Sequence, residues 1–226
     1  MGSYLVTGAS QGIGYEIVKA LIHEGHRVLG CSRNREKLEK LKSEMGCDVC
    51  ELDLASDDWR AFVEAVQAFG ELDGLVHNAG LLINKPFQDL SVEEVQRIYE
   101  VNVISAFRLI QEVSHLFSDE AHIVGIGSVG GMNASSKFPG LTAYSSSKAA
   151  LGVLIECLQA EYEGRNNWTF NCLALGAVGT EMLAKAFPGY TAPLLPEEMA
   201  SFISNFILTG HQYFKGKTLP VSRSNP

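Results

Sequence analysis

Short apolar segments of strand length alternate with amphipathic helical segments along the whole chain. This alternation is typical of a parallel sheet covered by helices on both faces. Because crossovers between parallel strands are right-handed, the pattern predicts an α/β fold with a doubly wound, Rossmann-like sheet of about seven strands. The predicted strands are residues 4–7, 27–31, 49–52, 74–77, 123–127, 169–174 and 218–221.

The segments between these strands set the expected domain organisation. Ser91, followed by Glu94, predicts a capping box at the start of a helix. An apolar series at helical spacing predicts a second helix from Val103 to Phe117, whereas residues 176–196 are expected to be irregular. Since no repeat or low-complexity linker interrupts the chain, all 226 residues are predicted to form a single domain.

Composition and charge limit the kinds of partner and compartment that are expected for this chain. The chain is 46% hydrophobic and carries a net charge of -8 without a basic run, which disfavours nucleic acid and anionic membranes as partners. No segment approaches ~18 consecutive apolar residues, so no membrane span is predicted. The first strand begins at residue 4, which leaves no room for a signal peptide, and the odd number of five cysteines suits a reducing compartment. A cytoplasmic protein is expected.

Cys47 and Cys50 form a C-x-x-C pair, a spacing that also occurs in redox and zinc sites. They fall on a predicted strand, where residues i and i+3 point to opposite faces. No second pair completes a four-ligand site. Structural cysteines and no metal site are therefore predicted.

Three glycines, Gly8, Gly12 and Gly14, lie between the first strand and the first helix. Backbone N–H groups at such a helix start favour a diphosphate, and glycine lets the chain approach it closely. The alternative, a turn that only packs strand on helix, is disfavoured by the strand–turn–helix context. At the end of the second strand, Ser32-Arg33 replaces the carboxylate that would bind an NAD ribose. Unless Arg33 is simply a solvated charge, NADP(H) is expected rather than NAD(H).

Tyr144 and Lys148 lie one turn apart on a predicted helix, so both side chains point to one face. A phenol with a pKa near ~10 is a poor acid at neutral pH, and a neighbouring ammonium lowers that pKa. The pair is therefore a candidate for proton transfer. The alternative is a surface tyrosine beside a solvated lysine.

Taken together, these motifs resemble the short-chain dehydrogenase/reductase family, in its compact single-domain form, over nearly the whole chain. Thr7-Gly-Ala-Ser-Gln-Gly-Ile-Gly14 is similar to the family's T-G-x-x-x-G-x-G motif, and Tyr144 with Lys148 matches its Y-x-x-x-K. Further matches are His77-Asn-Ala-Gly80 to N-N-A-G, Leu175-Gly176 with Thr180 to P-G-x-x-x-T, and the single residues Asp53, Asn102 and Ser128.

The resemblance implies hydride transfer between NADP(H) and a small-molecule carbonyl or secondary alcohol. Ser128 would orient the substrate, Tyr144 would transfer the proton, and Lys148 would lower the pKa of Tyr144 and bond the nicotinamide ribose. Asn102 would hold a water that feeds protons to Lys148, and Thr180 would bind the carboxamide. Singly, Ser128 could be a turn former and Asn102 a backbone-bonded helix residue. The implied cofactor-binding residues are Gly8, Ser10, Gln11, Gly12, Ile13, Gly14, Ser32, Arg33, Asp53, Leu54, Asn78, Ala79, Gly80, Tyr144, Lys148, Gly176, Val178 and Thr180.

Four features depart from the family pattern. The stretch between Ser128 and Tyr144 is longer than usual, which implies an enlarged loop beside the substrate, and Leu175 replaces the motif proline. His77 could be a catalytic base, although a structural role is favoured. The tail reads Val221-Ser-Arg-Ser224 in place of V-D-G-G.

Residues 181–196, called the lid below, are expected to cover the substrate. The lid is rich in apolar side chains, which suit an apolar carbonyl compound or simply pack: Met182, Leu183, Phe187, Tyr190, Leu194 and Leu195, with Lys185 as the only cation. An NADPH-dependent carbonyl or 3-oxoacyl reductase is the leading hypothesis. An NAD-linked alcohol dehydrogenase and a non-enzymatic dinucleotide-sensing or scaffolding protein are the alternatives. The resemblance also implies a homodimer or homotetramer built on the helices after Asn102 and from Tyr144.

Overall fold

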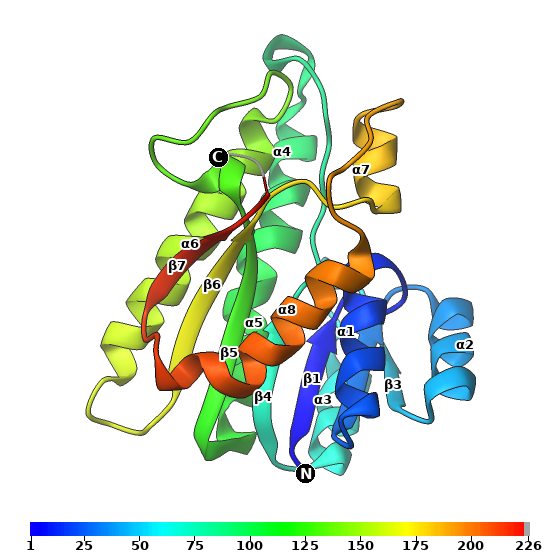
Figure 1. Ribbon diagram of the computed structural model, residues 1–226, viewed down its shortest axis with the longest axis vertical. Helices are drawn as coiled ribbons and strands as arrows, with labels where there is room; N and C mark the ends of the chain where they lie inside the picture. The colour runs from blue at the N-terminus through cyan, green and yellow to red at the C-terminus, as the bar shows by residue number, and fades with distance from the viewer. Residues whose placement is uncertain (224–226) are drawn as a thin grey trace.

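The computed structural model describes residues 1–223, and within them seven parallel strands form one sheet in the order β3-β2-β1-β4-β5-β6-β7. The chain runs outward from β1 to β3, returns to pair β4 with the other side of β1, and continues to β7 (Figure 1). This confirms the predicted doubly wound, Rossmann-like sheet. The strands are β1 (Ser3–Thr7), β2 (Arg27–Ser32), β3 (Asp48–Glu51), β4 (Leu72–His77), β5 (Phe117–Ser128), β6 (Thr169–Leu175) and β7 (Lys217–Val221).

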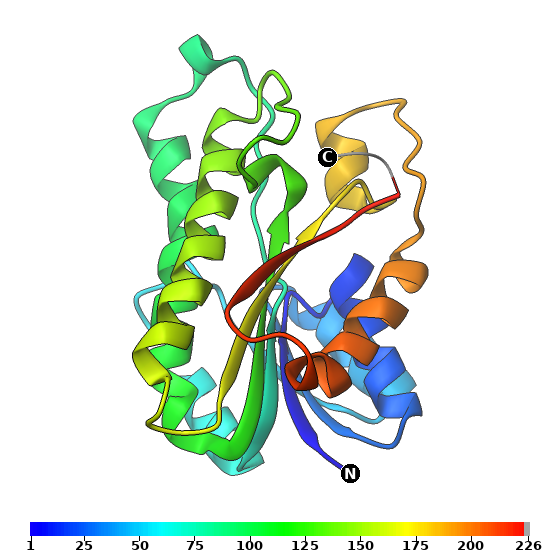
Figure 2. The same ribbon diagram turned by 60° about the vertical axis from the view of Figure 1, so that its left-hand side comes forward.

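Two layers of helices cover the sheet, as Figure 2 shows. Successive strand residues point to opposite faces, so Leu5 joins one apolar core and Val6 joins the other. Because both faces are buried, the central strands carry apolar residues in continuous runs. The first layer holds α1 (Gly12–His23), α2 (Arg35–Met45) and α8 (Pro196–Thr209); the second holds α3 (Arg60–Phe69), α4 (Val92–Tyr99), α5 (Ser105–Val113) and α6 (Thr142–Tyr162).

Helices α4 and α5 form one continuous rod with a π-helical segment, Glu100–Ile104, between them. The predicted capping box is present at its start, since Ser91 and Glu94 exchange hydrogen bonds. The prediction that Phe117 belongs to this helix is wrong, because α5 ends at Val113 and Phe117 opens β5. Phe117 pairs with β4 and packs edge-on against Trp168, so sheet pairing and tertiary packing override the helical spacing.

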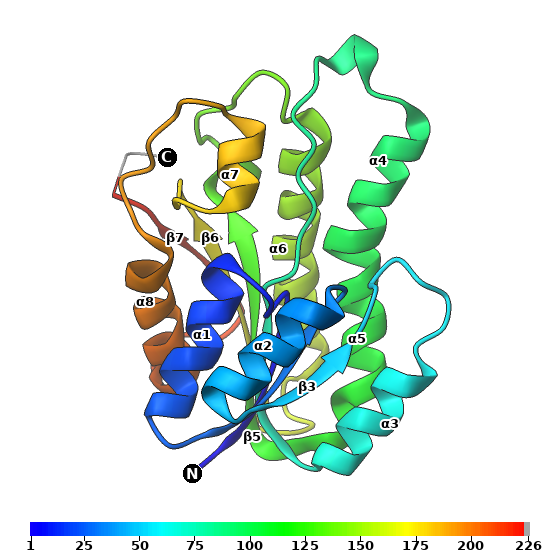
Figure 3. The ribbon, with the colours of Figure 1, turned by 90° about the vertical axis from the view of Figure 1, so that its right-hand side faces the viewer.

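The segment predicted to be irregular contains a short helix, α7 (Glu181–Ala186). Thr180 caps it by accepting a hydrogen bond from the Leu183 N–H at 3.2 Å. Figure 3 shows α7 above the start of α1, at the carboxyl ends of the strands. A parallel bridge between Val178 and Leu194, with the Gly179 N–H donating to the Leu194 carbonyl at 2.9 Å, closes the segment at its base.

The structure also locates the cysteines and the divergent tail. Cys47 precedes β3 and Cys50 lies opposite Cys31 of β2; both, like the other cysteines, are free thiols. Among residues 1–223, none of the helices combines the length and apolar character needed to cross a membrane. Ser224, at the end of the divergent tail, lies outside the described residues.

Candidate active site

A cavity of about 850 Å³ opens at the carboxyl ends of β1, β2, β4, β5 and β6. Strand order reverses between β1 and β4, which is where ligands of open α/β sheets bind. Every site residue predicted from the sequence lines this cavity except Gly14 and Asn102. The structure therefore brings together residues that are spread from position 8 to position 180 of the chain.

The glycine turn forms one wall. Gly8 and Gly12 have φ values of 68° and 58°, a left-handed conformation that side chains oppose. Gly14 lies behind the wall, where a Cβ would collide with the Gly8 carbonyl. Asn78 holds the turn from β4 by donating to the carbonyls of Thr7 and Gly8 at 3.0 and 3.3 Å. This narrow cradle fits the diphosphate of a dinucleotide.

The next part of the cavity is lined by residues that follow β2 and β3. The Ser32 hydroxyl donates to the Ser10 hydroxyl at 2.7 Å, and Arg33 lies exposed beside them. The end of β2 carries no carboxylate. Asp53 follows β3, lines the cavity and accepts a hydrogen bond from the Ala55 N–H at 3.1 Å. Hydroxyls and a guanidinium thus surround the place where a dinucleotide ribose would lie.

The floor of the cavity, as we call Ser128, Tyr144 and Lys148, is built on β5 and the start of α6. Lys148 is only 5% exposed, and its ammonium donates to the Ile126 carbonyl at 2.7 Å. Burial lowers the pKa of Lys148 to about 8. Its Nζ lies 6.0 Å from the centre of the Tyr144 ring.

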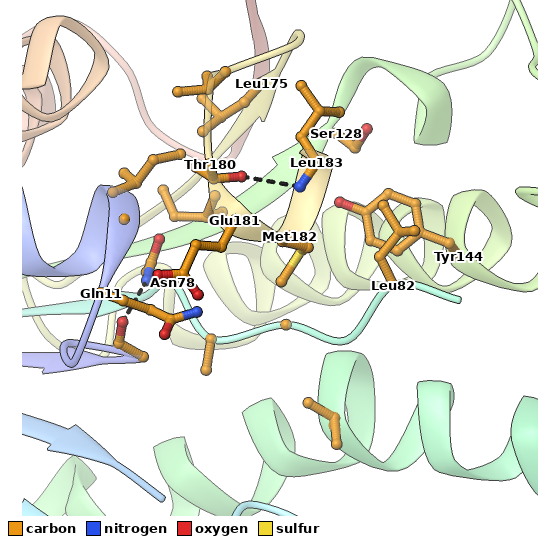
Figure 4. A pocket seen from close by; sticks show the side chains of 18 of the residues that line it. Gln11, Asn78, Leu82, Ser128, Tyr144, Leu175, Thr180, Glu181, Met182 and Leu183 are labelled. Carbon is orange, nitrogen blue, oxygen red and sulfur yellow. Dashed lines mark hydrogen bonds between the residues drawn. The ribbon is translucent and has the colours of Figure 1, made fainter. Parts of the chain in front are cut away.

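The pKa of Tyr144 is higher than that of an ordinary phenol. Figure 4 shows its hydroxyl pointing into the cavity, toward Ser128 and the lid residues Met182 and Leu183. Burial raises the pKa of Tyr144 to about 12, and a hydrogen bond with Ser128 opposes that shift in part. Desolvation is the largest influence on that pKa, and the Lys148 ammonium here bonds to a backbone carbonyl, so the lowering of the Tyr144 pKa by Lys148 stays a prediction.

Asn102 supports the floor from behind and does not line the cavity. Its fully buried side chain accepts from the Leu81 N–H at 2.7 Å and donates to the Leu81 carbonyl and to Ser147 Oγ, at 3.0 and 2.9 Å. Ser147 in turn donates to the Tyr144 carbonyl at 2.7 Å. The π-helical segment therefore ties the chain after β4 to the first turn of α6; π-bulges of this kind are frequent at functional sites.

His77 lies beneath the floor and does not line the cavity. It is 1% exposed, and its Nδ1 lies 3.3 Å from Thr7 Oγ1. Burial, together with the charge of Lys148, lowers the pKa of His77 to about 3. A ring with so low a pKa is a weak base near pH 7, and His77 does not line the cavity, which supports the structural interpretation over the base.

The outer part of the cavity is apolar. Leu194 and Leu195 do not line it: Leu194 packs against the core beside α8, and Leu195 is 53% exposed. The enlarged loop before α6 supplies two wall residues that the sequence gave no sign of, and Leu82 after β4 supplies another. The apolar wall consists of Leu82, Phe138, Leu141, Met182, Leu183, Phe187 and Tyr190, with Lys185 at its edge.

Two contacts missed from the sequence hold the segments around the cavity. Asn84 donates to the Ala186 carbonyl at 2.7 Å and so ties the chain after β4 to the end of α7. Lys137 donates to the carbonyls of Gly130 and Met132 and to Ser135, which folds the enlarged loop back on itself. Leu175 pairs with Val221, so β6 runs on through the position of the motif proline. The contact of Asn84 spans 102 positions of the chain, whereas those of Lys137 are local, and neither kind leaves a periodic signal in the sequence.

A doubly wound sheet, a glycine turn at its switch point and an adjoining Ser–Tyr–Lys group define a nicotinamide-dinucleotide-binding oxidoreductase. The family model for short chain dehydrogenases matches residues 3–191. The chain belongs to the short-chain dehydrogenase/reductase family, in agreement with the resemblance seen in its sequence.

Individual relatives agree with this assignment. The chain is 36% identical over 158 residues to carbonyl reductase (NADPH) 2 of Sus scrofa, a match that covers 70% of this chain and 64% of that relative. It is 30% identical to a rhamnolipids biosynthesis 3-oxoacyl-(acyl-carrier-protein) reductase of Pseudomonas aeruginosa, covering 96% of this chain and 93% of the relative. A short chain dehydrogenase structure from Salmonella enterica superposes with a TM-score of 0.86 at 28% identity, covering 97% and 95% of the two chains.

Proposed function

We propose that this protein is an NADP(H)-dependent carbonyl reductase, acting on an apolar ketone or a 3-oxoacyl compound. The observation that carries the proposal is the pair of hydroxyls from Ser128 and Tyr144, which share one cavity with the glycine turn and have the Lys148 ammonium beside them. The carbonyl and 3-oxoacyl reductases among the relatives support the same reaction class.

The cofactor would lie along the cavity, with its diphosphate on the turn from Gly8 to Gly14 and its adenine near Asp53 and Leu54. Gly176, Val178 and Thr180 would line the nicotinamide end. When bound, the cofactor supplies the hydride, which is the difficult part of the chemistry. The chain's own residues orient the carbonyl, exclude water and deliver the proton.

Tyr144 is the proton donor in this proposal. A phenol with a pKa of about 12 is fully protonated near pH 7, so it is in the correct state to donate in the reductive direction. Ser128 donates a hydrogen bond to the same carbonyl oxygen as it gains charge. The reaction leaves a phenolate, and the Lys148 ammonium, protonated below about pH 8, stabilises that charge in a site of low dielectric.

Asn102 acts as a positioning residue, because its side chain holds Leu81 and the first turn of α6 in place. We also propose that Asn102 holds a water that feeds protons to Lys148. Support for it comes from Gly80, beside which both the Asn102 Oδ1 and the Lys148 Nζ lie.

The preference for NADP(H) rests on Arg33 and on the missing carboxylate after β2. The alternative, an NAD-linked alcohol dehydrogenase, is tested by calorimetry with both cofactors. Tighter binding of NADH than of NADPH would refute the preference and favour the alternative.

The activity itself is tested by mixing purified protein with NADPH and a broad panel of ketones, 3-oxoacyl thioesters and aldehydes. We expect oxidation of NADPH with at least one apolar ketone. If cofactor binds and none of the panel reacts, the non-enzymatic dinucleotide-sensing or scaffolding alternative is preferred, although Tyr144 and Lys148 are both retained in this chain.

We infer a single domain and a cytoplasmic homodimer or homotetramer without nucleic-acid or membrane partners. Ile104 of the π-helical segment, Phe107 of α5 and Val153 of α6 are 47%, 47% and 59% exposed, which supports an interface on those helices. Light scattering that finds only monomers at micromolar concentration would contradict the oligomer.

A further inference from the structure

Lys37 lies where three segments of the chain meet; it does not line the cavity itself, but its partners Gln11 and Glu181 do. It is on the first turn of α2, and its ammonium donates to Gln11 Oε1 of the glycine turn at 2.5 Å. The same ammonium lies 3.6 Å from Glu181 Oε1, at the start of α7 in the lid. One cation thus connects the diphosphate cradle with the segment that covers the substrate.

The contact with Glu181 is easily exchanged. Its length of 3.6 Å exceeds that of a charge-assisted hydrogen bond, and the two side chains are 40% and 58% exposed. Exposed ion pairs of this kind are screened by water and hold their partners weakly. Nothing in the contact prevents Lys37 from turning to a stronger anion nearby.

A phosphate monoester is such an anion. It carries nearly two negative charges at neutral pH and offers three acceptor oxygens, whereas Glu181 carries one charge. The contact between Lys37 and Gln11 keeps the ammonium beside the turn that lines the cavity with Ser10, Ser32 and Arg33. A phosphate held by those residues would come within reach of the flexible lysine side chain.

We propose that Lys37 is a second cation for the 2′-phosphate of the cofactor, and that it exchanges its contact with Glu181 of the lid for that phosphate on binding. The inference rests on the proposed preference for NADP(H) and extends it, because Lys37 is neither on the glycine turn nor at the end of β2. Lys37 then determines specificity together with Arg33, and the 2′-phosphate releases one restraint on the lid.

The test measures how much the 2′-phosphate of a ligand adds to its affinity. Binding of adenosine 2′,5′-bisphosphate and of adenosine 5′-monophosphate is measured by calorimetry on the full-length chain and on Lys37→Met, which removes the charge but keeps most of the stem. We expect the variant to bind the bisphosphate about tenfold more weakly and the monophosphate within about twofold of the native affinity. An equal loss for both ligands, or no loss for either, would overturn the proposal.

Lys40→Met is the matched control. Lys40 lies one turn further along α2, is 72% exposed at its side chain and lies 3.8 Å from Glu44, which, unlike the partners of Lys37, does not line the cavity. We expect both affinities to stay native in this variant. A loss of bisphosphate affinity as large as that of Lys37→Met would assign the effect to general charge and overturn a specific contact.

The exchange with Glu181 is tested by Glu181→Gln in the native and in the Lys37→Met background. If Glu181 competes for Lys37, Glu181→Gln tightens bisphosphate binding about twofold to threefold in the native chain and has no effect once Lys37 is gone. An effect of equal size in both backgrounds would mean simple repulsion of the phosphate by Glu181 and would refute the exchange.

Arg33→Ala separates this inference from the proposed cofactor preference. If neither Arg33→Ala nor Lys37→Met changes the ratio of bisphosphate to monophosphate affinity, the NADP(H) preference itself fails. If Arg33→Ala lowers that ratio and Lys37→Met does not, the preference stands and only the role of Lys37 is rejected.

Discussion

The floor of the cavity and the lid above it are held in place by different means. Lys148 and Asn102 are almost fully buried and bond to backbone groups of β5 and of the chain after β4. The lid carries exposed side chains, among them Met182 at 37% and Tyr190 at 54%, and few polar contacts tie α7 to the rest of the molecule. Buried backbone contacts fix the floor, whereas the lid depends on contacts that water can replace.

Under the proposed function, this difference suits separate tasks in the two regions. A proton donor and its supporting cation must stay within a narrow geometry, so they belong on rigid elements. A wall that accepts an apolar carbonyl compound needs area and the capacity to adjust, and exposed apolar side chains on a short helix provide both. Changes in the floor should therefore alter the rate of the chemical step, and changes in the lid should alter substrate binding.

The largest expected effect is that of Tyr144→Phe. Loss of the hydroxyl removes the proton donor, and turnover should fall by a factor of about 10³, within the usual range for general acid catalysis. Cofactor affinity measured by calorimetry should stay within about twofold. Tyr213→Phe, which removes a hydroxyl from a residue that is 77% exposed and outside the cavity, is the control. Retained turnover in Tyr144→Phe would disprove the acid–base role.

The second effect is on stability in acid, and it concerns the support beneath the floor. Histidine in an unfolded chain binds a proton near pH 6.5, while burial keeps the pKa of His77 at about 3 in the folded chain. Between these values the unfolded state binds more protons, so the free energy of unfolding falls as the pH falls. From pH 7 to pH 5 this group should contribute a loss of about 2 kcal/mol.

Urea unfolding of the native chain and of His77→Asn at both pH values measures that contribution. The loss of stability between pH 7 and pH 5 should be smaller in the variant by about 2 kcal/mol. Equal losses would show that His77 does not control acid stability. A variant that keeps its fold and cofactor affinity but loses turnover would instead favour the catalytic-base interpretation.

The third effect is the pH dependence of reduction. Lys148 has a pKa of about 8 and is charged below that value, so the phenolate formed by Tyr144 loses its stabilising cation as the pH rises through 8. The value of kcat for carbonyl reduction should fall above pH 8, approaching tenfold per pH unit. Initial rates at saturating substrate and cofactor between pH 6 and pH 10 measure it. A flat profile up to pH 10 would contradict the role given to Lys148.

The smallest effect belongs to the lid. Asn84→Ala removes the hydrogen bond to the Ala186 carbonyl, a contact of about 1 kcal/mol. The KM for the carbonyl substrate should rise about fivefold, while kcat stays within about twofold. Asn167→Ala, at an exposed position outside the cavity, is the control. A fall in kcat with unchanged KM would place Asn84 with the floor and break the division between the two regions.

Sequence patterns predicted the sheet well because both of its faces are buried, which makes each central strand a short apolar run. The predicted boundary was wrong where a helix passes into a strand without an intervening glycine or proline. Phe117 follows Val113 at helical spacing, yet it pairs with β4 after a 3₁₀ turn, Ser114–Leu116. Helix α7 was missed because six residues are too short for a periodic signal.

The candidate site, too, could be predicted only in part from local sequence. Gly8, Tyr144 and Lys148 were predicted from a strand end and a helix start and Ser128 from the family resemblance, and all four line the cavity. Local spacing could not give the pKa of Tyr144, since that value depends on how deeply the surrounding chain buries the phenol. The contact of Lys37 with Glu181 joins residues 144 positions apart in the chain and likewise requires the fold.

The parallel bridge between Val178 and Leu194 makes residues 179–193 a closed loop that could be exchanged as a unit. Its two ends meet at one point, so a segment of different length or composition can be inserted there while the entry and exit of the chain remain where they are. Under the proposed function, replacing residues 179–193 with the corresponding segment of a related oxidoreductase should change substrate selectivity and leave the floor of the cavity in place.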